Sequence, residues 1–285
     1  MANWFVDTII PTLLASFIMF AVGYFYRNNV AEVISKQRRA FLQIMPFTIG
    51  RDSKITITYG CVAPEGSSDA FLLQQGDFSA IIKAREIINN VFAISKQEFI
   101  TSIDLSAQLL NYENILSISG PKWNAVTAKI MGELGCPVEF VSGKQMVKVT
   151  NKTTQKSVEY ETKKKAGELA TECYGIILSG SIDRPGHVKQ NVLICAGRTT
   201  LSTYSTVSYL NYLRCSKKEV SKLMKKGIKG DDKWCLLIRA KREQHTDENK
   251  NVPLHDTDIV FDIVQVFHQD DFLNPYTITY NKNIK

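Results

Sequence analysis

The amino-acid sequence predicts an α/β domain with a largely parallel sheet and a β-rich insertion, preceded by one N-terminal transmembrane helix. Two segments, at residues 114–134 and 191–213, each show a short apolar strand, a glycine, a polar turn and a helical pattern. That arrangement is the unit of an α/β domain with parallel strands. Alternating apolar residues at 145–161 predict a β-hairpin between the two segments. Residues 8–26 contain no charged side chain, which predicts the membrane-spanning helix.

The uncharged segment has the length of a membrane span. Its nineteen residues form a helix of roughly 28 Å, close to the hydrocarbon thickness of a bilayer. Trp4 and Phe5 at one end, and Tyr24 and Tyr26 at the other, suit the aromatic belts of two interfaces. A secretory signal peptide fits less well, because the first seven residues contain no lysine or arginine. A buried core helix, the other interpretation, rarely stays uncharged over this length.

Charges on the two sides of this segment predict its orientation. Residues 1–7 carry no basic side chain, whereas residues 27–51 carry one acid, Glu32, and five basic residues, Arg27, Lys36, Arg38, Arg39 and Arg51. The positive-inside rule therefore places residues 1–7 outside a cell inner membrane and residues 53–285 in the cytoplasm. Between the span at 8–26 and the domain, residues 27–52 form a basic juxtamembrane neck. We expect the neck to face anionic lipid headgroups of the bilayer.

Composition narrows the classes of partner and cofactor. Residues 27–51 supply +4 of the formal net charge of +7, so the rest of the chain is only mildly basic and no DNA partner is expected. The six cysteines contain no C-x-x-C pair and most lie in apolar runs, which indicates buried free thiols in a reducing compartment. The four histidines show no ligand spacing. We therefore expect no metal and no cofactor.

The first half of the chain predicts alternating strands and helices. A helical neck at 28–45 ends at Pro46, and a strand follows at 54–62. After the turn-rich loop 63–69, Asp77 is expected to cap a helix that extends to residue 92. Residues 99–105 and 114–120 are expected to be strands, and residues 126–134 a helix.

The second half adds the insertion and a further strand–helix unit. The hairpin pairs residues 145–150 with 156–161, and residues 173–181 form another strand. Strand 191–197 leads into a helix through residue 213, and a capping box at 216–219 opens a short helix that ends at Gly227. The last strands lie at 234–240 and 259–267. The lysine clusters at 163–165 and 222–229 are interpreted as solvated faces.

The two strand–glycine–helix junctions are the candidate ligand site of a Rossmann-like domain. In open α/β sheets, ligands bind at the carboxyl ends of strands, where helix N-termini attract phosphate or carboxylate groups. Each junction also places a cation after its glycine, and hydroxyl groups such as those of Ser202 and Thr203 add donors. The predicted ligand-binding residues are Gly120, Lys122, Asn124, Gly197, Arg198, Thr199 and Thr200, with Glu65 and Ser67 from the loop 63–69.

A second interpretation of these residues is purely structural. Glycine permits the strand-to-helix turn, and Asn124, Thr199 and Thr200 cap helices. Neither junction is a Walker A loop or a G-x-G-x-x-G loop. No Ser-His-Asp or Cys-His order is evident, so no catalytic residue is assigned.

The loop 63–69 and the turn at residues 195–200 resemble those of the CRISPR-associated Rossmann-fold (CARF) sensors and related nucleotide-sensing modules of bacterial defence systems. The resemblance covers residues 54–214, and the β-rich insertion at 145–181 departs from it. In that family a symmetric dimer binds a cyclic oligonucleotide with loops at these positions, and some relatives carry a transmembrane helix. The resemblance therefore implies a nucleotide-type ligand and a homo-oligomer.

Three functions are consistent with the sequence. The first is a membrane-anchored cytoplasmic sensor in which a nucleotide or cyclic oligonucleotide reorganises an oligomer and its anchors. The second is a membrane-tethered enzyme that hydrolyses a nucleotide or dinucleotide, with Glu65 or Asp69 placed beside Lys122 and Arg198. The third is a membrane scaffold that binds a protein partner through the β-rich insertion.

Overall fold

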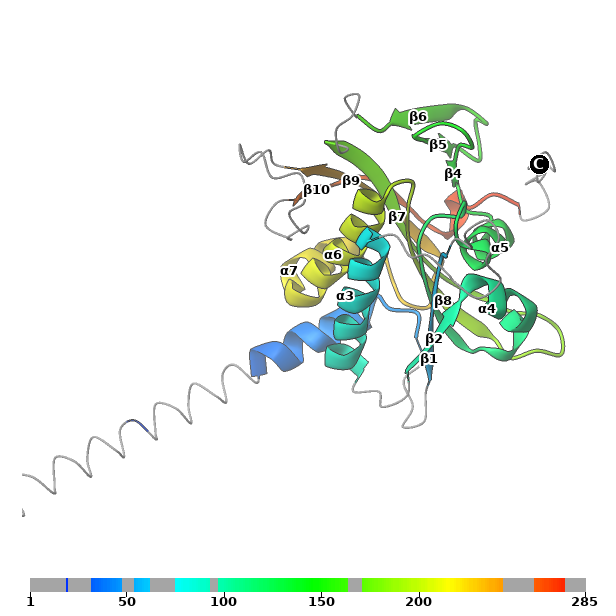
Figure 1. Cartoon of the computed structure of the whole chain (residues 1–285). Helices are drawn as coiled ribbons and strands as arrows, with labels where there is room; N and C mark the ends of the chain where they lie inside the picture. The colour runs from blue at the N-terminus through cyan, green and yellow to red at the C-terminus, as the bar shows by residue number, and fades with distance from the viewer. Residues whose placement is uncertain are drawn as a thin grey trace, which may run out of the picture.

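A computed structural model describes residues 19, 32–47, 54–61, 75–92, 97–163, 171–242 and 259–274 (Figure 1). It has a mixed α/β architecture with a largely parallel central sheet. In the described part of the chain this sheet has seven strands in the order β10-β9-β7-β8-β3-β1-β2. The strands are β1 (Ile55–Tyr59), β2 (Gln97–Thr101), β3 (Asn114–Ile118), β7 (Glu172–Ile182), β8 (Gln190–Gly197), β9 (Trp234–Arg242) and β10 (Ile259–Phe267).

Strand direction divides the sheet into two parts. Strands β2, β1, β3 and β8 are parallel to one another, which confirms the parallel sheet predicted from the two junctions. Strands β7, β9 and β10 extend this part by antiparallel pairing. The strand predicted at 173–181 therefore belongs to the central sheet, as β7, and not to the insertion. Its eleven residues are long enough to pair with both β8 and β9.

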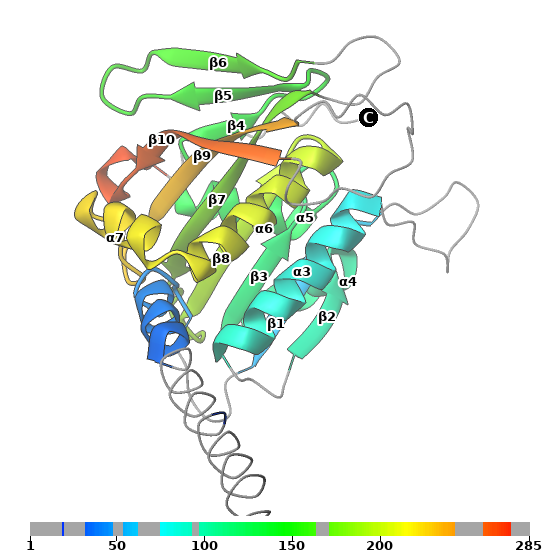
Figure 2. The ribbon, with the colours of Figure 1, turned by 90° about the vertical axis from the view of Figure 1, so that its left-hand side faces the viewer.

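Helices cover both faces of the sheet (Figure 2). Helices α3 (Gln75–Phe92) and α6 (Thr200–Cys215) lie side by side on one face, with α7 (Lys217–Lys225) beyond α6. Helices α4 (Ser102–Gln108) and α5 (Ala125–Leu134) pack on the other face. The helix after β3 thus lies on the face opposite to the helices that follow β1 and β8.

Two hydrophobic clusters, one on each face, hold the layers together. Alternate residues of β8 serve the two clusters: Leu193 and Cys195 face α3 and α6, whereas Val192 and Ile194 face α5. This period of two is what a strand buried on both faces requires. All of β8 is buried, so it forms the centre of the core.

The hairpin of the insertion is confirmed. Strands β5 (Met146–Thr150) and β6 (Ser157–Glu161) are antiparallel, and β4 (Val138–Phe140) pairs with β5 to complete a small three-stranded sheet. Inward-facing Val138, Val147 and Val149 join the cluster on the α5 side of the central sheet. The insertion is therefore packed onto the core and not only attached to it by its ends.

One expected strand is partly replaced by a helix. Residues 99–105 were expected to be extended, but β2 ends at Thr101 and α4 begins at Ser102. The Thr101 hydroxyl accepts a hydrogen bond from the backbone N–H of Asp104, which caps α4. Leu105 and Leu109 are both fully buried at helical spacing. Burial at a spacing of four residues favours a helix over a strand here.

The described part of the neck ends inside the core. Residues 32–42 are helical, and residues 43–44 form a turn before Pro46. Phe41 and Ile44 are completely buried in the cluster formed with α3 and α6. The predicted span at 8–26 lies outside the described residues, apart from Met19. Among the residues that the structure describes, no helix is long and apolar enough to cross a membrane.

Candidate functional site

The carboxyl ends of β1, β3 and β8 lie next to one another because these strands are parallel neighbours. We call this side of the sheet the carboxyl edge. At this edge Gly60 follows β1, Gly120 follows Ser119 at the end of β3, and Gly197 is the last residue of β8. Helices α5 and α6 begin a few residues later. Both predicted junctions therefore meet at one place.

Close packing of backbone explains the glycines. A Cβ atom on Gly120 would collide with the carbonyl oxygen of Gly197, and a Cβ on Gly197 would collide with Ser202 and Thr203 at the start of α6. A Cβ on Gly60 would come within 2.7 Å of the carbonyl oxygen of Trp123. The structural interpretation therefore accounts for Gly120 and Gly197 without a ligand.

A buried carboxylate connects three elements behind this edge. Asp77, in the first turn of α3, accepts a hydrogen bond from the Ser119 hydroxyl at 2.8 Å, and it also bonds with the Thr203 side chain of α6. Burial raises the pKa of Asp77, and the two hydrogen bonds oppose that shift. The expectation that Asp77 caps α3 is wrong, because α3 already begins at Gln75 and the carboxylate points to β3 and α6.

Asn124 is used by its own helix and strand. Its side-chain oxygen accepts the N–H of Thr127 and so caps α5, while its amide donates to the Ser117 hydroxyl and to the Ile118 carbonyl. Asn124 is completely buried. These bonds favour the capping role over direct contact with a ligand.

The residues that open α6 are also largely satisfied internally. Thr199 accepts the N–H of Ser202, and the Ser202 hydroxyl accepts the N–H of Thr199, which together form a capping box. Ser202 and Thr203 are buried, so the expected hydroxyl donors at these positions face the protein interior. Thr199 and Thr200 remain half-buried at the surface of the edge.

The two predicted cations differ in their surroundings. Lys122 is exposed, and its ammonium group lies 4.3 Å from the ring centre of Trp123. Arg198 is half-buried, which lowers the pKa of its guanidinium group. Its Nε donates to the carbonyl of Lys144 at 2.9 Å, so Arg198 connects the end of β8 to the turn between β4 and β5. Neither cation is paired with a carboxylate of the described residues.

Two helix N-termini at this edge retain free donors. The backbone N–H groups of Ala125 and Thr200, the first residues of α5 and α6, have no hydrogen-bond partner among the described residues. Such groups, together with the helix dipole, favour a phosphate or carboxylate. Glu65 and Ser67, with Asp69, lie outside the described residues, and so their distance from this edge is not defined.

The thiols near this edge are not activated. Burial raises the pKa of Cys173 and of Cys195 to about 12, and it also raises the pKa of Cys61. A thiol with a raised pKa is protonated near neutral pH and is a poor nucleophile. Within the described ranges, no group of three His, Cys, Asp or Glu side chains is placed to hold a metal ion.

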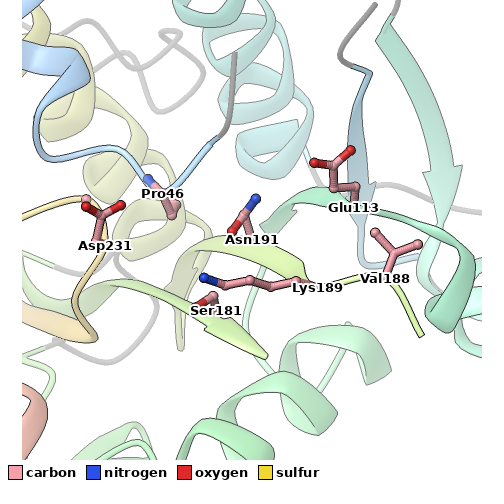
Figure 3. Close-up of a pocket in the computed structure, with 8 residues that line it drawn as sticks. Pro46, Glu113, Ser181, Val188, Lys189, Asn191 and Asp231 are labelled. Atoms are coloured by element: carbon pink, nitrogen blue, oxygen red, sulfur yellow. The ribbon is translucent and has the colours of Figure 1, made fainter. Parts of the chain in front are cut away.

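Sequence reasoning missed a polar pocket at the opposite edge of the sheet (Figure 3). The pocket has a volume of about 170 Å³. Lys189 lies across it, between Glu113 and Val188 at one end and Asp231 and Pro46 at the other. Its lining comes from segments that are far apart in the sequence. They include the end of β7, the start of β8 and the turn before β9. No local sequence pattern therefore reveals the pocket.

Comparison of the chain with protein-family models, with curated proteins and with solved structures found no match.

Proposed function

We propose that the chain is a single-pass membrane protein whose cytoplasmic, Rossmann-like domain binds a nucleotide-type ligand at the carboxyl edge. The anchor is the uncharged segment 8–26, oriented by the basic residues that follow it. The ligand is an anionic nucleotide, and the resemblance to CARF sensors points to a cyclic oligonucleotide. Binding changes the association of the domains and so the arrangement of the anchors in bacterial antiviral defence.

One observation carries the ligand proposal. The turns containing Gly120 and Gly197 are in backbone contact, and they bring the N-termini of α5 and α6 to the same edge as Lys122 and Arg198. A nucleotide supplies phosphates for the backbone donors of Ala125 and Thr200 and for the two cations. In open α/β sheets this edge is where such ligands bind.

The protonated thiols favour a sensor over an enzyme with a cysteine nucleophile. Homo-oligomerisation is supported by apolar side chains on the outer side of the domain. Phe78 and Ile82 of α3 are 53% and 45% exposed, and Phe99 on the edge strand β2 is 39% exposed. Exposed apolar groups beside a strand with one open edge, as β2 has among the described residues, are typical of a surface that another chain covers.

The direct test uses the purified full chain in detergent. Small molecules retained by the protein are identified by mass spectrometry, and nucleotides and cyclic oligonucleotides are titrated by calorimetry while native mass spectrometry follows the oligomeric state. We expect the double variant Lys122→Ala/Arg198→Ala to weaken binding by roughly tenfold to hundredfold, because hydrogen bonds to charged groups are lost. Lys129→Ala/Arg214→Ala is the matched control and should bind normally. Absence of any nucleotide binding by the parent chain contradicts the proposal.

A further inference from the structure

Helix α7 carries a cluster of exposed lysines. Its apolar residues Val220 and Leu223 are buried against the core. The opposite side of the helix and the turn that follows it expose six lysines, Lys217, Lys218, Lys222, Lys225, Lys226 and Lys229. Lys222 pairs with Glu219 at 2.7 Å. The other five have no acidic partner in the described part of the chain.

The fold fixes this cluster beside the neck. The backbone N–H of Gly230, in the turn after α7, donates to the carbonyl of Gln43 at 2.8 Å. A Cβ on Gly230 would collide with the carbonyl oxygen of Met45, so the two turns are in direct backbone contact. Ile228 and Phe41 are both completely buried in one hydrophobic cluster. In Figures 1 and 2 α7 accordingly lies next to the helix of the neck.

Joining these segments concentrates positive charge on one side of the domain. Residues 216–233 contain seven lysines against three acids, Glu219, Asp231 and Asp232. The described neck, residues 32–47, adds Lys36, Arg38 and Arg39 against Glu32, which pairs with Lys36. We call the six exposed lysines together with Lys36, Arg38 and Arg39 the basic surface. The two segments that carry it, residues 32–47 and 216–233, have net charges of +2 and +4, which together make +6 of the formal +7.

We propose that the basic surface binds the anionic headgroups of the bilayer that holds the anchor, so that the domain lies against the membrane. This inference rests on the proposed function, because the anchor at 8–26 is what places the neck at the bilayer. Clusters of basic residues next to a membrane segment are attracted to anionic lipids, and the attraction decreases within a Debye length of about 8–10 Å. The lysine cluster of α7 is then a lipid-binding face, not only a solvated one.

The chemistry of α7 favours lipid over nucleic acid. The helix contains lysines but no arginine and no aromatic residue. Lysine acts as a flexible point charge and so suits many separate headgroup phosphates. Nucleic-acid recognition more often uses bidentate hydrogen bonds from arginine and stacking of bases on aromatic side chains. The neck also leads directly into the uncharged segment.

The test measures how close α7 lies to a membrane. Cys215, at the end of α6, is exposed, whereas the other five cysteines are buried, so a thiol-reactive donor dye labels this position selectively. The labelled full chain is reconstituted in vesicles of phosphatidylcholine, with or without phosphatidylserine, that carry an acceptor dye on the headgroups. We expect energy transfer to rise with phosphatidylserine and to fall again in high salt.

Two variants with equal loss of charge isolate the basic surface. Lys225→Gln/Lys229→Gln should roughly halve the rise with phosphatidylserine, since two of the unpaired lysines are removed. Lys129→Gln/Lys156→Gln removes exposed lysines from α5 and from the turn between β5 and β6, and it should leave the rise unchanged. An equal effect of the two variants, or no dependence on phosphatidylserine, overturns the inference.

Carbonate extraction of the same membranes separates this inference from the proposed anchor. If the protein resists extraction but shows no dependence on phosphatidylserine, the result supports the anchor and contradicts the lipid-binding face. Protein that is extracted, yet floats with phosphatidylserine vesicles and not with phosphatidylcholine vesicles, has the face but no membrane span. Binding of an RNA or DNA probe that Lys225→Gln/Lys229→Gln weakens, without any response to phosphatidylserine, assigns the surface to nucleic acid instead.

Discussion

The hydroxyl of Ser119 donates a hydrogen bond of 2.8 Å to the buried carboxylate of Asp77, across 42 residues of sequence. Ser119 adopts a positive φ of 92°, which is unusual for a residue other than glycine and costs roughly 1–3 kcal/mol. The bond joins the start of α3 to the turn after β3, and Thr203 brings α6 to the same carboxylate. This contact therefore holds the starts of α3 and α6 and the turn after β3 in fixed positions at the carboxyl edge.

The Asp77 carboxylate gives the folded protein a predictable dependence on pH. Because burial raises its pKa above the ordinary value of 3.8, the folded state holds this proton more tightly than the unfolded chain. The contribution of Asp77 to the free energy of unfolding is therefore largest below pH 3.8 and is lost as the pH rises through the raised pKa. Asp77→Asn removes this dependence. The free energy of unfolding of the variant, measured with denaturant, should therefore rise relative to that of the parent chain as the pH rises from 4 to 7.

Two further variants check that assignment. Asp183→Asn changes an exposed carboxylate in the turn after β7 and should leave the pH dependence of unfolding as it is in the parent. Asp77→Ala leaves the Ser119 and Thr203 hydroxyls without their acceptor and should cost about 1–3 kcal/mol at neutral pH. If Asp77→Asn follows the parent at every pH, the buried carboxylate does not carry the dependence.

Sequence patterns predicted the elements of this fold better than their long-range contacts. The short apolar runs of β3 and β8 and the glycines at their carboxyl ends are local signals, and they located both junctions. The bond between Asp77 and Ser119 has no local signal, and the sequence pattern around Asp77 predicts only a helix cap. In the same way, Ser202 and Thr203 could not be recognised as buried, since the pairing of α3 with α6 is a tertiary contact.

Gly197→Ala tests the close contact between the two junctions. The added Cβ meets the backbone N–H of Thr203, which cannot move without displacing α6, so we expect a loss of about 3 kcal/mol in the free energy of unfolding. Gly143→Ala is the comparison, because Gly143 has a positive φ of 75° but open space around it. It should cost only about 1 kcal/mol of backbone strain. Equal losses in a thermal unfolding experiment would contradict the contact.

Two buried threonines, one in strand β1 and one in helix α5, should respond in opposite directions to replacement by valine. The hydroxyl of Thr58 in β1 is buried and has no hydrogen-bond partner among the described residues. Thr58→Val should therefore raise the free energy of unfolding by about 1 kcal/mol. Thr127 donates its hydroxyl to the Ser119 carbonyl, and Thr127→Val should cost about 1–3 kcal/mol. Denaturant midpoints that shift in the same direction for the two variants would show that the two hydroxyls do not differ in hydrogen bonding.

Cysteine reactivity should distinguish one thiol from the other five. Cys215 is exposed, whereas burial raises the pKa of Cys173 and Cys195 to about 12 and so suppresses their thiolate forms. Titration of the native full chain with a chromogenic disulfide should therefore give one fast thiol, and all six only after denaturation. Cys215→Ser should remove the fast phase. A second fast thiol in the native chain would show that another cysteine is accessible.

Two single alanine substitutions in the neck test where the folded domain begins. Phe41 is completely buried among residues of α3 and α6, whereas Ile34 lies about two helical turns earlier with 57% of its surface exposed. Phe41→Ala leaves a cavity in the core and should lower the free energy of unfolding by about 3–5 kcal/mol. Ile34→Ala should change it by less than about 0.5 kcal/mol. Because the same helix carries both residues, a large difference between them means that the end of the neck at Phe41 is part of the folded core. Similar small losses for the two variants would show instead that the neck is only tethered to the domain.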